Sequence, residues 1–126
     1  MTSKVLIVDD SKLARMAVSR VLNMLYPDWK TVEAANADQA LSCVEQESPD
    51  FVLLDFNMPG KDGLVLAEEL RTLHPQLHVA VISANHQVEV VNRAHAAGAT
   101  FLRKPLTEQA LKQFLTDAPK ANQARS

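Results

Sequence analysis

Four apolar runs in this chain each end at a side chain that could take part in chemistry. Residues 5–8 lead into Asp9 and Asp10, residues 51–54 into Asp55, residues 79–82 into Ser83, and residues 100–103 into Lys104. Such runs indicate strands, and the carboxyl ends of parallel strands meet at one edge of a sheet. We therefore expect three carboxylates, a hydroxyl and an ammonium group to converge at that edge.

This combination of groups predicts a site for a metal ion and a phosphoryl group. Two unit charges about 4 Å apart repel each other by roughly 4 kcal/mol at an effective dielectric constant of about 20, so Asp9, Asp10 and Asp55 should need a cation. Their hard oxygen atoms favour Mg²⁺, and Mn²⁺ would also fit. Lys104 would add a positive charge and Ser83 a hydroxyl donor, which suits phosphoryl transfer. A carboxylate can also act as the nucleophile and form an acyl phosphate.

Strands and helices must alternate to position these groups. We predict strands at residues 4–8, 31–35, 51–54, 78–83 and 100–103, and helices at residues 11–25, 37–47, 63–73, 87–97 and 107–115. Asn36 with Gln39 has the spacing of a helix-capping box, and Gly98 is a typical residue to follow a helix. The alternation indicates βαβ units, a parallel sheet and helices on both of its faces.

The polarity of the strands predicts their order. The first, third and fourth strands are nearly continuous apolar runs, as expected for strands covered on both faces. The second and fifth strands contain polar residues, which suits the edges of a sheet. We therefore predict an α/β fold, a flavodoxin-like three-layer (βα)5 sandwich with strand order 2-1-3-4-5. Asp9, Asp10 and Asp55 would lie where that order reverses, the usual place for a site in such sheets.

Length and composition narrow the function classes. The 126 residues suffice for one domain but not for two, and we expect a domain at residues 1–118 followed by a flexible tail at residues 119–126. The net charge of -2 gives no electrostatic basis for direct nucleic-acid binding. No apolar run approaches the roughly 18 residues of a membrane span. With the single Cys43 and a first strand that starts almost at Met1, we expect a cytoplasmic protein without a signal peptide.

From about Lys4 to Asp117, the chain resembles the receiver domain of two-component response regulators, and its stand-alone form is similar to CheY. Five motifs carry the resemblance: Asp9-Asp10, Asp55 within the sequence LDFNMPG, Asp62-Gly63, Ser83-Ala84 and Lys104-Pro105. Each motif is weakly specific alone. All five in this order, at the ends of the predicted strands, are very specific.

The resemblance implies a role for each residue of the site. Asp55 would accept a phosphoryl group from a sensor histidine kinase or a histidine phosphotransfer protein. Asp10 would bind Mg²⁺ directly, Asp9 would help through water, and the backbone carbonyl of Asn57 would add a ligand. Lys104 would pair with phosphoryl oxygens. Asn57 and Asn85 occupy positions that tune hydrolysis of the phosphate in this family, and catalysis would be limited to the protein's own phosphorylation and dephosphorylation.

The resemblance also implies a conformational switch. Ser83 would hydrogen-bond a phosphoryl oxygen after moving inward, and the ring of Phe101 would turn inward with it. The peptide bond between Lys104 and Pro105 would be cis, a form largely confined to proline. The fourth helix, fifth strand and fifth helix would then form the surface that binds a separate downstream protein, in a phosphorelay of which chemotaxis is one example. The protein would be a monomer or a phosphorylation-dependent dimer.

Other functions fit the residues less well. A binding module that uses this fold without phosphorylation would normally lack Asp55 or Lys104, and both are present. A haloacid-dehalogenase-like phosphatase would need a second aspartate at Ser11. A flavodoxin would have to bind FMN phosphate beside Asp9 and Asp10, which would repel it.

Several residues have a simpler interpretation. Acids such as Asp9 and Asp10 are also common at helix entries. Leu13 and Met16 could bind a kinase or phosphotransfer helix, or could be ordinary packing residues. Four arginines look like parts of solvated helix faces: Arg15, Arg20, Arg71 and Arg93.

Overall fold

The computed structural model describes residues 3–58, 62–84 and 87–124, with side chains described up to residue 116. Five parallel strands form one sheet in the order β2-β1-β3-β4-β5. The strands are β1 (Lys4–Val8), β2 (Lys30–Ala34), β3 (Phe51–Asp55), β4 (His78–Ser83) and β5 (Thr100–Arg103). The predicted fold class and strand order are confirmed.

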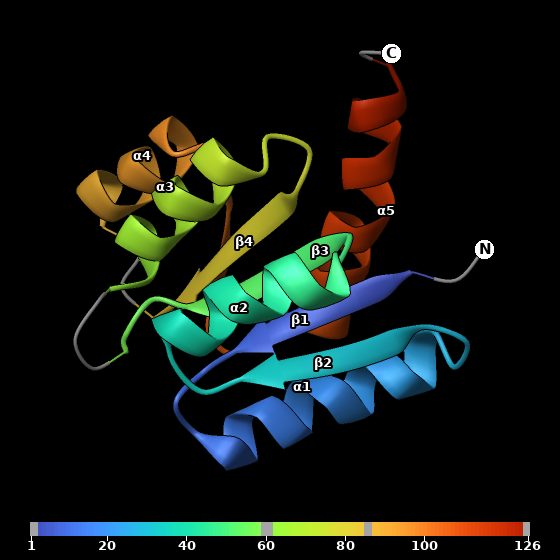
Figure 1. Ribbon diagram of the computed structural model, residues 1–126. Helices are drawn as coiled ribbons and strands as arrows, with labels where there is room; N and C mark the ends of the chain where they lie inside the picture. Colours follow the sequence, from blue (N-terminus) through green and yellow to red (C-terminus); the bar gives the residue numbers. More distant parts are fainter. Residues whose placement is uncertain (1–2, 59–61, 85–86, 125–126) are drawn as a thin grey trace.

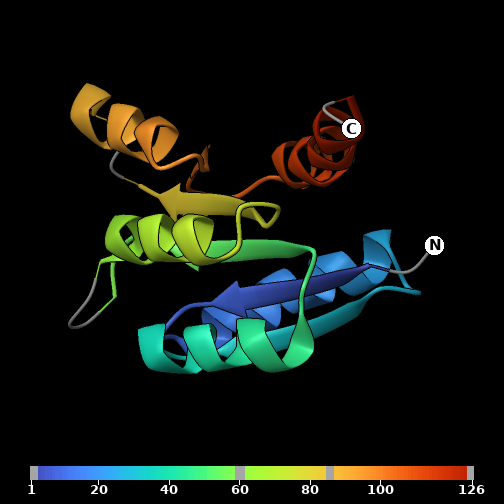
Figure 2. The same cartoon turned by 45° about the horizontal axis from the view of Figure 1, so that its top comes forward.

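Five helices alternate with the strands and cover both faces of the sheet (Figures 1 and 2). They are α1 (Lys12–Leu25), α2 (Ala37–Glu47), α3 (Gly63–Leu73), α4 (Val88–Ala96) and α5 (Glu108–Ala124). Helices α1 and α5 lie on one face, and α2, α3 and α4 lie on the other. No helix among the described residues is long and apolar enough to cross a membrane.

Each face of the sheet has its own hydrophobic core, because successive side chains of a strand point to opposite faces. In β1, Leu6 and Val8 pack towards α2 and α3, whereas Val5 and Ile7 pack towards α1 and α5. All four are at most 2% exposed. Burial on both faces explains why the central strands are apolar throughout.

The predicted boundaries hold to within about a residue except at the last helix. Asn36 caps α2 by accepting a hydrogen bond from the backbone N–H of Gln39 (2.9 Å), and Gly98 follows α4 with a φ of 79°. Helix α5 continues to Ala124, past the predicted end at residue 115, so most of the expected tail at residues 119–126 is helical. The alanine, lysine and glutamine residues after Leu115 are strong helix formers, and Pro119 does not end the helix.

Candidate functional site

The carboxyl edge of the sheet brings the predicted site residues together. The register pairs Val8 with Leu54 and Asp55 with Ile82, so the central strands end at nearly the same level. Carboxylate oxygens of Asp9, Asp10 and Asp55 lie within 4.8 Å of one another. The three acids come from two different strand ends, so only the folded sheet assembles them.

Asp55 is the buried member of this acidic cluster, which we define as Asp9, Asp10 and Asp55. It is 6% exposed, and its carboxylate oxygen Oδ1 accepts a hydrogen bond from the Lys104 ammonium group at 2.8 Å. A buried carboxylate is normally paired, and Lys104 supplies that pairing here. The Lys104 side chain is 39% exposed, so the ion pair opens towards solvent on the Lys104 side.

Backbone contacts hold the strand ends that carry the pair. The Lys104 N–H donates to the Ser83 carbonyl at 3.0 Å, and the Phe56 N–H donates to the Ile82 carbonyl at 2.9 Å. Ser83 is fully buried beside these contacts. The peptide bond between Lys104 and Pro105 is cis, as predicted.

Gly63 lets helix α3 approach the backbone of Asp55. A Cβ atom at position 63 would lie 2.6 Å from the Asp55 carbonyl oxygen and 2.9 Å from the Cα of Phe56. Both distances are too short for a side chain, and the opposing atoms belong to the backbone. The Gly63 N–H also donates to the Phe56 carbonyl at 3.0 Å. Glycine at this position therefore permits the close packing of α3 against the main chain around the buried Asp55 carboxylate.

Asp9 is held in an unfavourable electrostatic environment. Burial raises the pKa of its carboxyl group above the usual 3.8, and the negative charges of Asp55 and Asp10 raise it further. A hydrogen bond from the Ser11 N–H (2.9 Å) and the charge of Lys104 lower the pKa of the same carboxyl group, but they only partly offset the rise. Asp10 is exposed to solvent. Among the residues that the structure describes, the ammonium group of Lys104 pairs with Asp55, and three acids lie together at this site.

The donor atoms of the cluster fit a hard divalent cation. Carboxylate oxygens this close together are the ligands that Mg²⁺ and Mn²⁺ prefer, and an exposed member such as Asp10 leaves room for bound water. Asn57, whose carbonyl was predicted as a further ligand, follows β3 and is itself exposed. The excess negative charge gives a physical reason for a cation at this edge.

The predicted switch residues lie close to the site on neighbouring strands. Phe101 is half-buried and packs against the core on the α2–α4 face of the sheet. Ser83 and Phe101 lie on the paired strands β4 and β5. Their movement on phosphorylation stays a prediction, and Asn85 lies outside the described residues.

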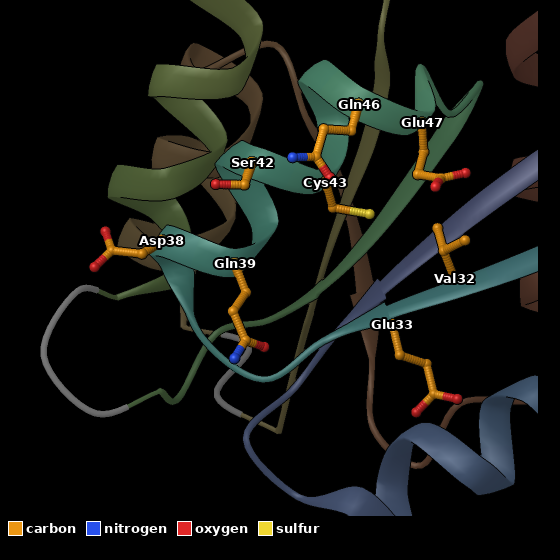
Figure 3. Close-up of a pocket in the computed structure, with 8 residues that line it drawn as sticks. All are labelled: Val32, Glu33, Asp38, Gln39, Ser42, Cys43, Gln46 and Glu47. Carbon is orange, nitrogen blue, oxygen red and sulfur yellow. The ribbon is translucent and has the colours of Figure 1, made fainter.

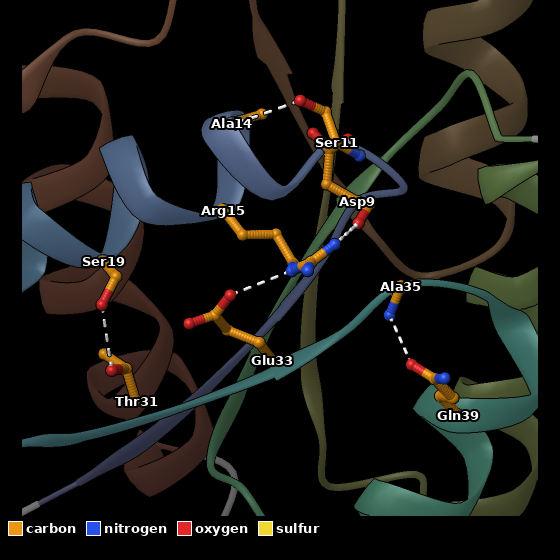
Figure 4. A network of polar contacts seen from close by, with 9 residues as sticks. All are labelled: Asp9, Ser11, Ala14, Arg15, Ser19, Thr31, Glu33, Ala35 and Gln39. Atoms are coloured by element: carbon orange, nitrogen blue, oxygen red, sulfur yellow. Dashed lines mark hydrogen bonds and ion pairs between the residues drawn. The ribbon is translucent and has the colours of Figure 1, made fainter.

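Two arginines that we expected on solvated faces have specific partners, so that prediction was wrong for both. The Arg15 side chain is only 14% exposed and contacts Glu33 and the backbone of Asp9 (Figure 4). Arg71 donates to the carbonyl groups of Pro75 and Leu77 and so holds the loop before β4. No sequence pattern indicates the pairing of Arg15 with Glu33, because their contact depends on how α1 packs against β2.

A depression of about 550 Å³ lies between β2 and α2 (Figure 3). It is lined by residues of those two elements, and none of them belongs to the acidic cluster. Burial is the largest cause that raises the pKa of the Cys43 thiol at this depression, and the charge of Glu47 adds to it. A raised pKa disfavours the reactive thiolate form of Cys43.

Comparisons with known proteins agree with the geometry. A profile of the response regulator receiver domain matches residues 5–116. Sporulation initiation phosphotransferase F of Bacillus subtilis is 32% identical over 120 residues, covering 91% of this chain and 95% of that protein. The glycerol metabolism activator of Pseudomonas putida is 36% identical, but the match covers 51% of it. The chain thus spans about half the length of several longer relatives.

Solved structures show the same architecture. The chemotaxis protein CheY4 of Vibrio cholerae superposes with a TM-score of 0.84 at 26% identity, covering 94% of this chain and 99% of that one. A CheY-like receiver domain protein of Methanospirillum hungatei superposes with a TM-score of 0.89 over all of both chains, and at 21% identity this likeness shows the fold alone.

Proposed function

Because this chain belongs to the response regulator receiver domain family, we propose that it is a switch protein whose Asp55 accepts a phosphoryl group from a sensor histidine kinase or a histidine phosphotransfer protein. The observation that carries the proposal is the buried Asp55 carboxylate, paired with Lys104 at 2.8 Å beside two further acids. Burying charged groups at the end of an apolar strand costs free energy, so stability alone does not explain why these charges lie together.

The transfer would make Asp55 the nucleophile. A carboxylate oxygen of Asp55 forms a bond to phosphorus as the bond between phosphorus and the donor's imidazole nitrogen breaks, and the nitrogen keeps the electron pair. Lys104, already beside this carboxylate, would then pair with the phosphoryl oxygens. Positioning and neutralisation of charge account for most of the catalysis in such transfers. The protein would catalyse only this phosphorylation and the later hydrolysis of the aspartyl phosphate, in which water takes the phosphoryl group, inorganic phosphate leaves and the Asp55 carboxylate is restored.

The acidic cluster and the Asn57 carbonyl would hold Mg²⁺. A bound Mg²⁺ would offset the charge that develops on the phosphoryl oxygens. The role of this chain is to keep Asp9, Asp10 and Asp55 within reach of one ion. The pKa of Asp9 is raised by burial and by its acidic neighbours, and the added positive charge would favour its ionised form.

Phosphorylation would change which partner the protein binds. Ser83, fully buried next to the site, and Phe101, on the neighbouring strand, would move together and alter the surface formed by α4, β5 and α5. A phosphoryl group can favour this state only through contacts that differ between the two conformations, and Ser83 would supply one. The downstream target would be a protein that recognises this surface.

Helix α1 offers a contact for the phosphodonor protein. Leu13 is 79% exposed and Met16 is 44% exposed, so neither is an ordinary packing residue. Both lie at the start of α1, next to Asp10. We expect Leu13→Glu to slow transfer from a cognate kinase and to leave phosphorylation by acetyl phosphate unchanged. Equal slowing of both reactions would exclude docking through Leu13.

Intact mass after incubation with Mg²⁺ and acetyl phosphate tests the proposed function. We expect a gain of one phosphate in the wild type, and no gain with a chelator or in the Asp55→Ala variant. Failure of the wild type to gain phosphate or to bind beryllofluoride would instead favour a binding module that works without phosphorylation.

A further inference from the structure

Arg15 connects the acidic cluster to the edge strand of the sheet (Figure 4). One terminal nitrogen of its guanidinium group donates to the backbone carbonyl of Asp9 at 2.6 Å, and its Nε donates to Glu33 Oε1 at 2.9 Å. The Arg15 side chain is 14% exposed, so its contact with the Asp9 carbonyl is partly buried, whereas its contact with Glu33 is open to solvent. Three elements thus meet at one side chain: α1 supplies Arg15, β2 supplies Glu33, and the end of β1 supplies Asp9.

We propose that Arg15, oriented by Glu33, is a positioning residue that holds the backbone of Asp9 so that its carboxylate stays in the metal-binding cluster. This inference rests on the metal-binding role proposed above. Arg15 would touch neither the ion nor the phosphoryl group. It would act through the main chain of Asp9, which it contacts directly.

Asp9 needs to be held because its neighbours repel it. The charges of Asp55 and Asp10 both oppose ionisation of the Asp9 carboxyl group. Its backbone N–H donates to the Ala34 carbonyl at 3.1 Å, and the contact from Arg15 fixes the other side of the same residue. Without Arg15, the Asp9 carbonyl would lose its donor and the segment could relax away from Asp55.

The guanidinium group suits this task because its planar fork donates in two fixed directions at once. Lysine at this position would keep the positive charge, but a single ammonium group could not reproduce both contacts in the same geometry. Glu33 fixes the orientation of the fork and is itself 40% exposed. Because exposed ion pairs contribute little to the free energy of unfolding, the Arg15–Glu33 pair adds little stability. Its role is to fix the orientation of the guanidinium group.

A positioning role and a simple charge effect predict opposite results for metal affinity. Removing a nearby cation should, by charge alone, make the acidic cluster more attractive to Mg²⁺. Loss of positioning should instead weaken Mg²⁺ binding, because the three carboxylates would no longer be held together. Residues that orient metal ligands typically contribute about 10- to 100-fold to metal affinity.

The test is a Mg²⁺ titration followed by amide chemical shifts in ¹H–¹⁵N NMR spectra of the full chain. We expect Arg15→Ala and Arg15→Lys to bind Mg²⁺ about tenfold more weakly than the wild type, and Glu33→Gln to show a smaller loss. Arg20→Ala is the matched control, since Arg20 is an exposed arginine of the same helix. It should bind Mg²⁺ as well as the wild type or slightly better.

The same spectra show whether each variant is folded, and Glu33→Gln keeps the test informative if Arg15→Ala does not fold. Wild-type affinity in Arg15→Lys and Glu33→Gln would overturn the positioning role and leave the proposed function intact. Tighter binding in Arg15→Ala would show a charge effect alone and would also overturn it. A wild type that binds no Mg²⁺ would instead refute the metal site of the proposed function.

Discussion

The two edges of the sheet are built on different principles. At the amino edge, aromatic rings stack on one another: Tyr26 and Trp29 have ring centroids 4.1 Å apart, and Trp29 and Phe51 are 5.7 Å apart. Phe114 of α5 packs against Phe51 edge-on, at 5.8 Å. At the carboxyl edge, carboxylate oxygens of Asp9, Asp10 and Asp55 lie within 4.8 Å of one another, and Asp55 pairs with Lys104. The first arrangement stabilises the fold without a ligand, whereas the second keeps like charges close together, and a bound cation would offset their repulsion.

The carboxylates of the two edges show the same contrast. Glu47 lies near the amino edge, where a hydrogen bond from Lys4 and the charge of Lys30 lower the pKa of its carboxyl group. Asp9 lies at the carboxyl edge, where burial and acidic neighbours raise the pKa of its carboxyl group. Charges near the amino edge are matched within the protein. At the carboxyl edge, Lys104 pairs with Asp55, but the carboxylates of Asp9, Asp10 and Asp55 still lie close to one another.

Removing the central ring of the amino edge should have the largest effect on stability. Phe51 is 1% exposed, and Phe51→Ala should lower the free energy of unfolding by about 3–5 kcal/mol because it leaves a cavity. Urea unfolding followed by circular dichroism measures this loss. The folded fraction should still gain phosphate from acetyl phosphate. Loss of phosphorylation in the folded fraction would show that the two edges are not independent.

Crowding the backbone at the carboxyl edge should affect both stability and chemistry. Gly63→Ala places a Cβ atom 2.6 Å from the Asp55 carbonyl oxygen, so the main chain must move. We expect a loss of about 1–3 kcal/mol in unfolding free energy, as for an overpacked site, together with slower phosphorylation. Ala67→Gly in the same helix is a useful control, since it should lower stability without slowing phosphorylation of the folded protein. An unchanged phosphorylation rate in Gly63→Ala would show that this backbone position is unimportant to Asp55.

Neutralising one acid of the cluster should stabilise the protein when metal is absent. Asp10→Asn removes like-charge repulsion, and we expect a gain of about 0.5 kcal/mol because Asp10 is exposed and water screens its charge. The same change should weaken Mg²⁺ binding. Unfolding in the presence of a chelator, with and without later addition of Mg²⁺, measures both effects. A clear loss of stability without metal would contradict the picture of a repulsive cluster.

Lowering the pH should change the free energy of unfolding in opposite directions through Glu47 at the amino edge and Asp9 at the carboxyl edge. These changes should be smaller than the effects of the substitutions above. The lowered pKa of Glu47 stabilises the fold above its usual value of 4.5, and this stabilisation is lost as pH falls through the folded-state pKa. The raised pKa of Asp9 means that its ionisation opposes folding; this penalty is complete above the folded-state pKa and absent below 3.8.

Metal-free unfolding between neutral pH and about pH 3.5 distinguishes the two carboxyl groups. Glu47→Gln should destabilise the protein at neutral pH, and Asp9→Asn should stabilise it. The difference in unfolding free energy between each variant and the wild type should become smaller as the pH falls. Asp9→Asn keeps an oxygen that can accept the hydrogen bond from Ser11, so it isolates the charge. If both variants changed the free energy of unfolding at neutral pH in the same direction, the two edges would not differ in their balance of charge.

Much of this contrast could be predicted from the sequence. The apolar runs specified β1, β3 and β4 because a strand covered on both faces has to be apolar throughout. The convergence of Asp9, Asp10 and Asp55 followed from parallel pairing, which brings the carboxyl ends of strands to one edge.

Other features depended on tertiary packing that the sequence does not display. Arg15 looks like any exposed arginine of an amphipathic helix until α1 packs beside Glu33 and the end of β1. Helix α5 extends past its predicted end because the alanine, lysine and glutamine residues around Pro119 are strong helix formers. Gly63 begins the predicted helix at residues 63–73, but its close contact with the Asp55 backbone appears only in three dimensions.

The most direct test of the account is a chemical-shift map of the protein with Mg²⁺ and beryllofluoride, which mimics a phosphoryl group on an aspartate. We predict large amide shifts around Asp10, Asp55 and Ser83, and little change at the side-chain indole N–H of Trp29, the single tryptophan of the chain. The Asp55→Ala variant should lose the shifts caused by beryllofluoride. Shifts centred on the amino edge, or none at the acidic cluster, would contradict the assignment of the site to the carboxyl edge.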